Sequence, residues 1–148
     1  MSTLLLDASA LLAAFDKEDA YHESAKALLA DQDVSLVTLD LARYEIANVA
    51  VCAWREPEWV ASLLEAVDRI ADDGGVIASD TKLLEEAAKL AEERSISVYD
   101  AAYVAAASRG ARTLISCDRR DLLSKDLAVS PSDARSPSAA QTERPATD

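Results

Sequence analysis

The chain has 148 residues, half of them hydrophobic, and its 27 acidic and 15 basic side chains give a formal net charge of −12. This length suits one domain with a real core, and only three glycines argue against a glycine-rich phosphate loop or a turn-dense all-β fold. The charge has the wrong sign for holding nucleic acid through a broad basic surface. Three alternatives stay open: another kind of substrate, bound metal ions that reverse the field locally, or a basic partner.

Cysteine and histidine are too few for the commonest metal and catalytic sites. Cys52 and Cys117 form no Cys-x-x-Cys pair and His22 is the single histidine, which argues against a zinc site and most nucleophilic triads. Both cysteines lie in apolar contexts, which predicts buried side chains. The apolar N-terminus lacks a basic start and contains Asp7, and no apolar run approaches the ~18 residues that span a membrane. We therefore expect a soluble cytoplasmic protein.

The first half of the chain alternates short apolar strands with helices. Ser9 is the predicted N-cap of the first helix, Thr38 or Asp40 caps the third, and Pro57 suits a first helical turn. The predicted elements are a strand at Thr3–Leu6, helices at Ala10–Phe15 and Ala20–Leu29, a strand at Val34–Val37, and helices at Leu41–Trp54 and Pro57–Ala71.

The second half continues the alternation after the Gly74-Gly75 break. The predicted elements are an extended piece at Val76–Ile77, a helix that starts near Ser79 or Asp80 and ends near Arg94, a helix opened by Ser97 or Asp100 and ended by Gly110, a strand at Thr113–Ile115, a short helix or turn at Asp118–Leu123 and a last strand at Leu127–Val129. The predicted buried stripe of the first of these helices is Leu83, Leu84, Ala87, Leu90 and Ala91.

Strands that alternate with helices favour a three-layer α/β/α sandwich around a mostly parallel sheet of four to five short strands. After Pro131 the sequence becomes rich in serine, proline and charge, with almost no apolar residues. Such a composition cannot build a core. The sequence therefore predicts one domain at 1–131 and a disordered tail at 132–148.

Four acidic residues are placed where a functional site is expected. Asp7 and Asp118 directly follow predicted strands, and ligands of parallel α/β folds gather beyond the carboxyl ends of strands. Glu45 shares a largely apolar helical face with Leu41, Asn48 and Cys52, where a carboxylate costs several kcal/mol unless a metal or a cation compensates it. Asp100 begins an alanine-rich helix that can pack closely on the sheet. Helix capping, the helix dipole or an ion pair explains each acid taken singly.

Taken together, the four acids suit a divalent metal site. Mg²⁺ and Mn²⁺ prefer oxygen ligands, and carboxylates from several elements can hold one or two such ions that activate water for attack on a phosphorus atom. This pattern predicts metal-dependent hydrolysis of a phosphodiester.

The four acids also lie in segments that resemble the PIN-domain family of nucleases. The segment LLLDASALLAAF resembles its opening, ARYEIANV its second motif, VYDAAYVAAA its third and TLISCDRRDL its fourth. The resemblance runs from about Leu4 to Pro131 and extends to the VapC-type toxins of toxin–antitoxin pairs. It implies an endoribonuclease that uses Mg²⁺ or Mn²⁺, forms a homodimer and is inhibited by a cognate antitoxin.

The resemblance also assigns roles to residues. It implies that Asp7, Glu45, Asp100 and Asp118 form the catalytic metal site, with Asp121 as a weaker candidate. Ser9 and Ser116 would support the site by hydrogen bonding. Separately, the adjacent Arg119 and Arg120 offer cations that could grip a phosphate, or they are a solvated pair.

Two other functions remain possible from the sequence. A metal-dependent phosphatase or phospho-acceptor domain also places an aspartate after its first strand, but Ser9 stands where the dehalogenase type has a second aspartate. A non-catalytic interaction module with this fold is the other alternative. The sequence contains no base-reading motif that would name an RNA target.

Overall fold

The structure, a computed structural model that describes residues 2–134, is a parallel sheet with helices on both faces. The strands are β1 (Ser2–Leu6), β2 (Val34–Leu39), β3 (Val76–Ile77) and β4 (Thr113–Ile115), in the order β3-β2-β1-β4. The helices are α1 (Ala8–Ala13), α2 (His22–Ala30), α3 (Leu41–Asn48), α4 (Val60–Asp72), α5 (Thr81–Arg94) and α6 (Val98–Arg109). The shorter helical turns are π-helical η1 (Val49–Ala53), 3₁₀ η2 (Pro57–Trp59) and π-helical η3 (Arg119–Leu123).

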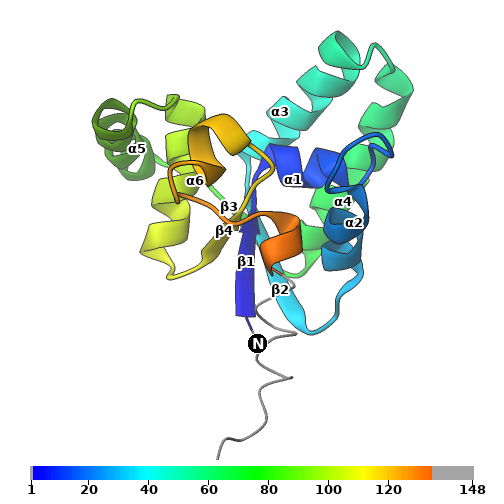
Figure 1. Cartoon of the computed structure of the whole chain (residues 1–148), viewed down its shortest axis with the longest axis horizontal. Helices are drawn as coiled ribbons and strands as arrows, with labels where there is room; N and C mark the ends of the chain where they lie inside the picture. The colour runs from blue at the N-terminus through cyan, green and yellow to red at the C-terminus, as the bar shows by residue number, and fades with distance from the viewer. Residues whose placement is uncertain (1, 135–148) are drawn as a thin grey trace, which may run out of the picture.

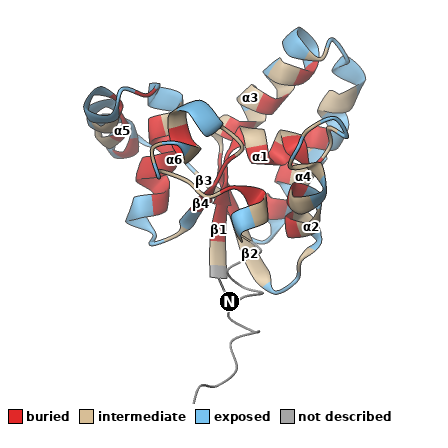
Figure 2. Ribbon diagram, in the orientation of Figure 1, coloured by how far each residue is buried: buried red, intermediate tan, exposed pale blue. Residues whose placement is uncertain are grey.

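The three-layer prediction is confirmed. In Figure 1, α5 and α6 lie on one side of the sheet and α1, α2 and α4 on the other. Every strand pair is parallel, which βαβ crossovers require. The strand β1, which lies between β2 and β4, is buried at Leu4, Leu5 and Leu6 (Figure 2), as expected for a strand that helices cover on both faces.

Several predicted boundaries are wrong in detail. The strand predicted at Leu127–Val129 is reduced to a single parallel bridge between Ile115 and Val129. The helix predicted at Leu41–Trp54 turns π-helical at Val49, and Ala20 and Tyr21 precede α2 because the side chain of Asp19 accepts from the backbone of Tyr21 in a local turn. Leu84 and Cys52 were predicted buried but are exposed.

Residues 131–134 form a helical turn, and most of the tail predicted at 132–148 lies outside the described residues. No helix within residues 2–134 is long and apolar enough to cross a membrane.

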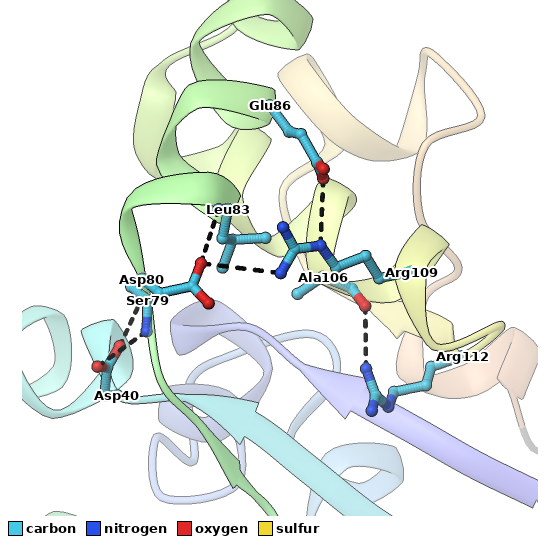
Figure 3. A network of polar contacts seen from close by, with 8 residues as sticks. All are labelled: Asp40, Ser79, Asp80, Leu83, Glu86, Ala106, Arg109 and Arg112. Atoms are coloured by element: carbon cyan, nitrogen blue, oxygen red, sulfur yellow. Dashed lines mark hydrogen bonds and ion pairs between the residues drawn. The ribbon is translucent and has the colours of Figure 1, made fainter.

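A polar network fixes the helices that carry the third acidic motif (Figure 3). The side chain of Arg109 on α6 contacts Glu86 at 3.2 Å and Asp80 at 3.8 Å, both beside or on α5. Asp40 was predicted as a cap of α3, but it makes no side-chain capping bond; its carboxylate accepts from the backbone and hydroxyl of Ser79. These contacts join α3, α5 and α6 into one unit.

Candidate metal centre

The carboxyl ends of β1 and β4 bring two of the predicted acids to one edge of the sheet. The backbone N–H of Asp7 donates to the carbonyl of Ile115 at 3.1 Å, which continues the pairing of the two strands. Asp118 follows Ile115 by three residues. The strand-end argument made from the sequence therefore places both residues correctly.

Asp7 is a buried carboxylate with a structural role and an electrostatic cost. It is 4% exposed, and its Oδ1 accepts from the Ala10 N–H at 3.0 Å and the Ser9 hydroxyl at 2.6 Å. Asp7 is thus the N-cap of α1, and the prediction that Ser9 caps this helix is wrong: Asp7 has the extended backbone of a cap, whereas Ser9 is already inside the helix. Burial, with a smaller contribution from the charge of Asp100, raises the pKa of Asp7 to about 6.

Two serines join the first and fourth acidic motifs. The hydroxyl oxygens of Ser9 and Ser116 lie 3.2 Å apart. The Ser9 hydroxyl also accepts from the Cys117 N–H at 2.9 Å, and that of Ser116 accepts from the Asp118 N–H at 3.0 Å. These hydrogen bonds link the segment of Asp7 to the segment of Asp118.

Three carboxylates gather at the start of α6 and η3. Asp100, Asp118 and Asp121 each offer an oxygen, and these oxygens all lie within 4.8 Å of one another. Ser97 caps α6 by accepting from the Asp100 N–H at 3.0 Å, so the Asp100 carboxylate is not needed as the cap. Partial burial and the charges of Asp118 and Asp121 raise the pKa of Asp100. Asp121, the weaker candidate from sequence, is a full member of this cluster.

Glu45 approaches the same region from α3. The predicted shared face of α3 is wrong in its orientation: Asn48 and Cys52 are exposed, while the fully buried stripe is Ala42, Ile46 and Ala50. Glu45 lies at the border of that stripe. Partial burial raises the pKa of Glu45, and the charges of Asp7 and Asp100 add to the effect.

Tyr103 is a site residue that the sequence reasoning missed. It is 1% exposed, and its hydroxyl donates to Glu45 Oε1 at 2.8 Å. Burial next to Glu45 raises the pKa of Tyr103, so the phenol stays protonated and remains a donor. The available signal was its spacing of three from Asp100, which places both residues on one face of α6.

The donor set fits a hard divalent cation. The cluster offers carboxylate oxygens, the ligands that Mg²⁺ and Mn²⁺ prefer, and like charges this close repel unless protons or a cation intervene. His22 takes no part, because its Nδ1 hydrogen-bonds the carbonyl of Ala13 at 2.8 Å. Asp100, Asp118 and Asp121 would hold such an ion directly, with Asp7 and Glu45 beside them.

Tyr103→Phe should weaken metal binding without disturbing the fold. The phenol–carboxylate hydrogen bond lowers the pKa of Glu45, so its loss favours the protonated acid, which does not bind cations. We expect the dissociation constant for Mn²⁺ to rise about tenfold, as for other residues that orient ligands. Calorimetric Mn²⁺ titrations at pH 6 and pH 8 would measure this, with a larger defect at pH 6. An equal defect at both pH values would contradict the explanation.

Comparison with known proteins agrees with the geometry. A family model described as PIN domain matches residues 4–126 of the chain. Ribonuclease VapC3 of Pyrobaculum aerophilum is 34% identical over 125 residues, which cover 79% of this chain and 90% of that protein. The crystal structure of PAE2754 from the same organism superposes with a TM-score of 0.65 and 26% identity, covering 94% of this chain and 90% of that one.

A more distant solved structure has the same fold. It is described as a toxin-antitoxin complex from Klebsiella pneumoniae, and it superposes with a TM-score of 0.62 at 18% identity, covering 86% of this chain and 97% of that one. The family model and the likeness to VapC3 each span most of the chain. The chain belongs to the PIN-domain family and, within it, to the VapC group.

Proposed function

We propose that this protein is a Mg²⁺- or Mn²⁺-dependent endoribonuclease and the toxin of a toxin–antitoxin pair. The observation that carries the proposal is the carboxylate cluster of Asp100, Asp118 and Asp121, flanked by Asp7 and Glu45. The likeness to a protein named Ribonuclease VapC3 supports RNA as the substrate. PIN-domain membership disfavours the phosphatase-type alternative.

The acidic residues come from different elements of the fold, and their positions indicate what each would do in catalysis. A divalent ion at the cluster would lower the pKa of a bound water and offset charge on the leaving oxygen. Asp100 and Asp118 present their oxygens from α6 and from the end of β4, and the Asp118 Oδ1 also accepts from the Asp121 N–H at 3.0 Å. Tyr103 donates a hydrogen bond that holds the Glu45 carboxylate in place.

Asp100→Asn tests the proposal directly. The substitution keeps the size of the side chain and removes one negative ligand, so we expect Mn²⁺-dependent RNA cleavage to fall about 100-fold or more. Asp72→Asn is the control, because Asp72 is an exposed acid at the end of α4. Cleavage of labelled RNA by both variants would be followed on gels, together with calorimetric Mn²⁺ titration.

Two results would refute the nuclease proposal. One is a wild-type protein that neither binds Mn²⁺ nor cleaves RNA with Mg²⁺ or Mn²⁺, which would favour the non-catalytic interaction module. The other is equal cleavage by wild type and Asp100→Asn.

The partner we propose is a small antitoxin with a basic, apolar segment. A cavity of about 420 Å³ lies between the end of α1 and η2, lined by Phe15, Asp16, Lys17, Glu18, Trp54, Glu56 and Trp59. Its aromatic rings contact each other edge to face, with three acids and one lysine around them. Such a cavity suits a segment with apolar and cationic side chains. Since RNA and an antitoxin meet in the cytoplasm, we propose that location.

We further propose a homodimer that forms through an apolar patch on α3, α5 and α6. The patch surrounds a cavity of about 260 Å³ and comprises Leu41, Tyr44, Leu84, Val98 and Tyr99, and the buried Ala102 also lines the cavity. Tyr44 is 78% exposed and Tyr99 63%, which is unusual for large rings on a monomer surface. Covering these side chains with a second copy would remove them from water.

Leu84→Glu should convert this dimer to a monomer. The substitution places a charge in the patch without changing a residue of the carboxylate cluster, and burying that charge against a second copy would cost several kcal/mol. Val51→Glu is the matched control, because Val51 is 48% exposed against 44% for Leu84 and lies on η1 outside the patch. Analytical ultracentrifugation would give the masses. A dimeric Leu84→Glu protein would exclude this patch as the interface.

A further inference from the structure

Arg119 is an exposed cation that directly follows Asp118, a member of the carboxylate cluster, and is held in one position by Tyr21. Its guanidinium carbon lies 5.3 Å from the centre of the Tyr21 ring, within range of a cation–π interaction. Its Nε donates to the Tyr21 hydroxyl at 3.3 Å. Because Arg119 directly follows Asp118, this contact sets the direction of a positive charge next to a cluster member.

Tyr21 is itself held in place by the protein, so Arg119 contacts a side chain of fixed position. Its ring packs on the small buried cluster of Ala13, Ala14 and Ala25, together with Cys117. Its backbone N–H donates to Asp19 Oδ1 at 2.8 Å at the start of α2. One part of the ring is therefore anchored in the protein, while the ring face and the hydroxyl hold Arg119.

Arg119 has no carboxylate within ion-pair distance among residues 2–134, although the chain carries 27 acids. Arg43, Arg69 and Arg109 do pair with carboxylates. The aromatic contact leaves most of the guanidinium N–H groups unused, since only Nε donates to Tyr21. Because Arg119 forms no ion pair with the neighbouring acids, it does not neutralise the carboxylate cluster. Its guanidinium also keeps its capacity to bind an anion.

RNA, the proposed substrate, offers such an anion in each phosphate of its backbone. A guanidinium binds phosphate oxygens through paired hydrogen bonds, and a protein of net charge −12 repels RNA elsewhere. We propose that Arg119, positioned by Tyr21, binds an RNA phosphate next to the one that is cleaved, and that Arg120 does not. This inference rests on RNA being the substrate. Arg120 differs from Arg119 in that, among the described residues, its side chain makes no ring contact or ion pair.

Binding and turnover of RNA would test this inference. Random-sequence single-stranded RNA of about 20 nucleotides, fluorescently labelled, would be titrated by anisotropy with Ca²⁺ and cleaved with Mn²⁺. For Arg119→Gln we expect the Kd and KM to rise about tenfold, kcat to change less than about threefold and Mn²⁺ affinity to stay unchanged. The slope of log Kd against log salt should fall by about one phosphate contact.

Three further variants make the inference specific. Tyr21→Leu keeps the apolar packing but loses both contacts to Arg119, so it should approach the Arg119→Gln phenotype. Arg120→Gln should raise the Kd less than about twofold. Arg69→Gln removes the same charge from an exposed position on α4, on the other side of the sheet from α6, and should behave as wild type.

The outcomes separate this inference from the nuclease proposal. Equal Kd values for wild type and Arg119→Gln, or equal losses in the Arg119→Gln and Arg120→Gln variants, would overturn it. A fall in kcat with unchanged KM would also overturn it, since Arg119 would then serve the cluster and not the RNA. A wild-type protein that binds RNA through Arg119 but never cleaves it would support the phosphate site and refute the nuclease.

Discussion

Asp7→Asn should stabilise the metal-free protein at neutral pH and abolish its RNA cleavage. The pKa of Asp7 is raised from 3.8 to about 6 by burial, so the folded state prefers the protonated acid. The protonated Asp7 therefore stabilises the fold fully below the pKa that this carboxyl has in the unfolded chain. This stabilisation is lost as the pH rises through 6. At pH 7.5 the ionised side chain therefore costs the fold on the order of 2–3 kcal/mol. Asparagine carries no charge and can still accept from Ala10 as an N-cap.

The pH dependence distinguishes this explanation from a general packing effect. Urea unfolding with EDTA should give a higher free energy of unfolding for Asp7→Asn at pH 7.5 and nearly equal values at pH 4. Mn²⁺ should raise the melting temperature of the wild type more than that of the variant, because ion binding favours the ionised acid. A variant less stable than wild type at pH 7.5, or equally active, would contradict the prediction.

Gly75→Ala should destabilise the fold far more than Gly74→Ala, although the two glycines are neighbours. A Cβ on Gly75 would collide with the Leu36 carbonyl oxygen and lie 2.8 Å from Ile70 Cγ2. The first collision involves the backbone of β2, which cannot rotate away. We expect a loss of about 3 kcal/mol. At Gly74 nothing lies within 4 Å of the added atom, and the cost is that of a left-handed backbone at φ +77°, about 1 kcal/mol.

The pair also tests how α4 ends. The N–H of Gly75 donates to Ile70 and that of Gly74 to Ala71, both at 2.9 Å, which is the hydrogen-bond pattern of a Schellman cap. Urea denaturation of both variants at one pH would measure the two losses. Equal losses would mean that backbone conformation, and not the close approach of β2, is what demands glycine at position 75.

The sequence predicted elements of the fold that depend on local patterns. The strands at β1 and β4 and the start and end of α5 follow from apolar runs and capping residues, and the two strand ends bring Asp7 and Asp118 to one edge of the sheet. The prediction from the sequence was wrong where two neighbouring side chains can both fill the same role. Both Asp7 and Ser9 can cap a helix, and only the pairing of Asp7 with Ile115 decides between them.

Long-range partners were beyond the sequence. Glu45 and Tyr103 are 58 positions apart, and nothing in either local pattern shows that they share a hydrogen bond. The rotation of α3 is set by its packing, which buries Ile46 and leaves Cys52 exposed. The contact of Tyr21 with Arg119 spans 98 positions and likewise depends on the tertiary fold.

The burial of α6 bears on how the site can move. Every residue from 101 to 107 is buried, so this helix can neither rotate nor slide without opening the core. Residues 119–123, by contrast, lie at the surface with Leu122 as their single buried side chain. The cluster thus has one half set in the core and one half at the surface, where Asp118 is bonded to Ser116 and Arg119 to Tyr21. An RNA strand would reach the carboxylates from the surface half, and we expect any adjustment that admits it in the exposed side chains there and not in α6.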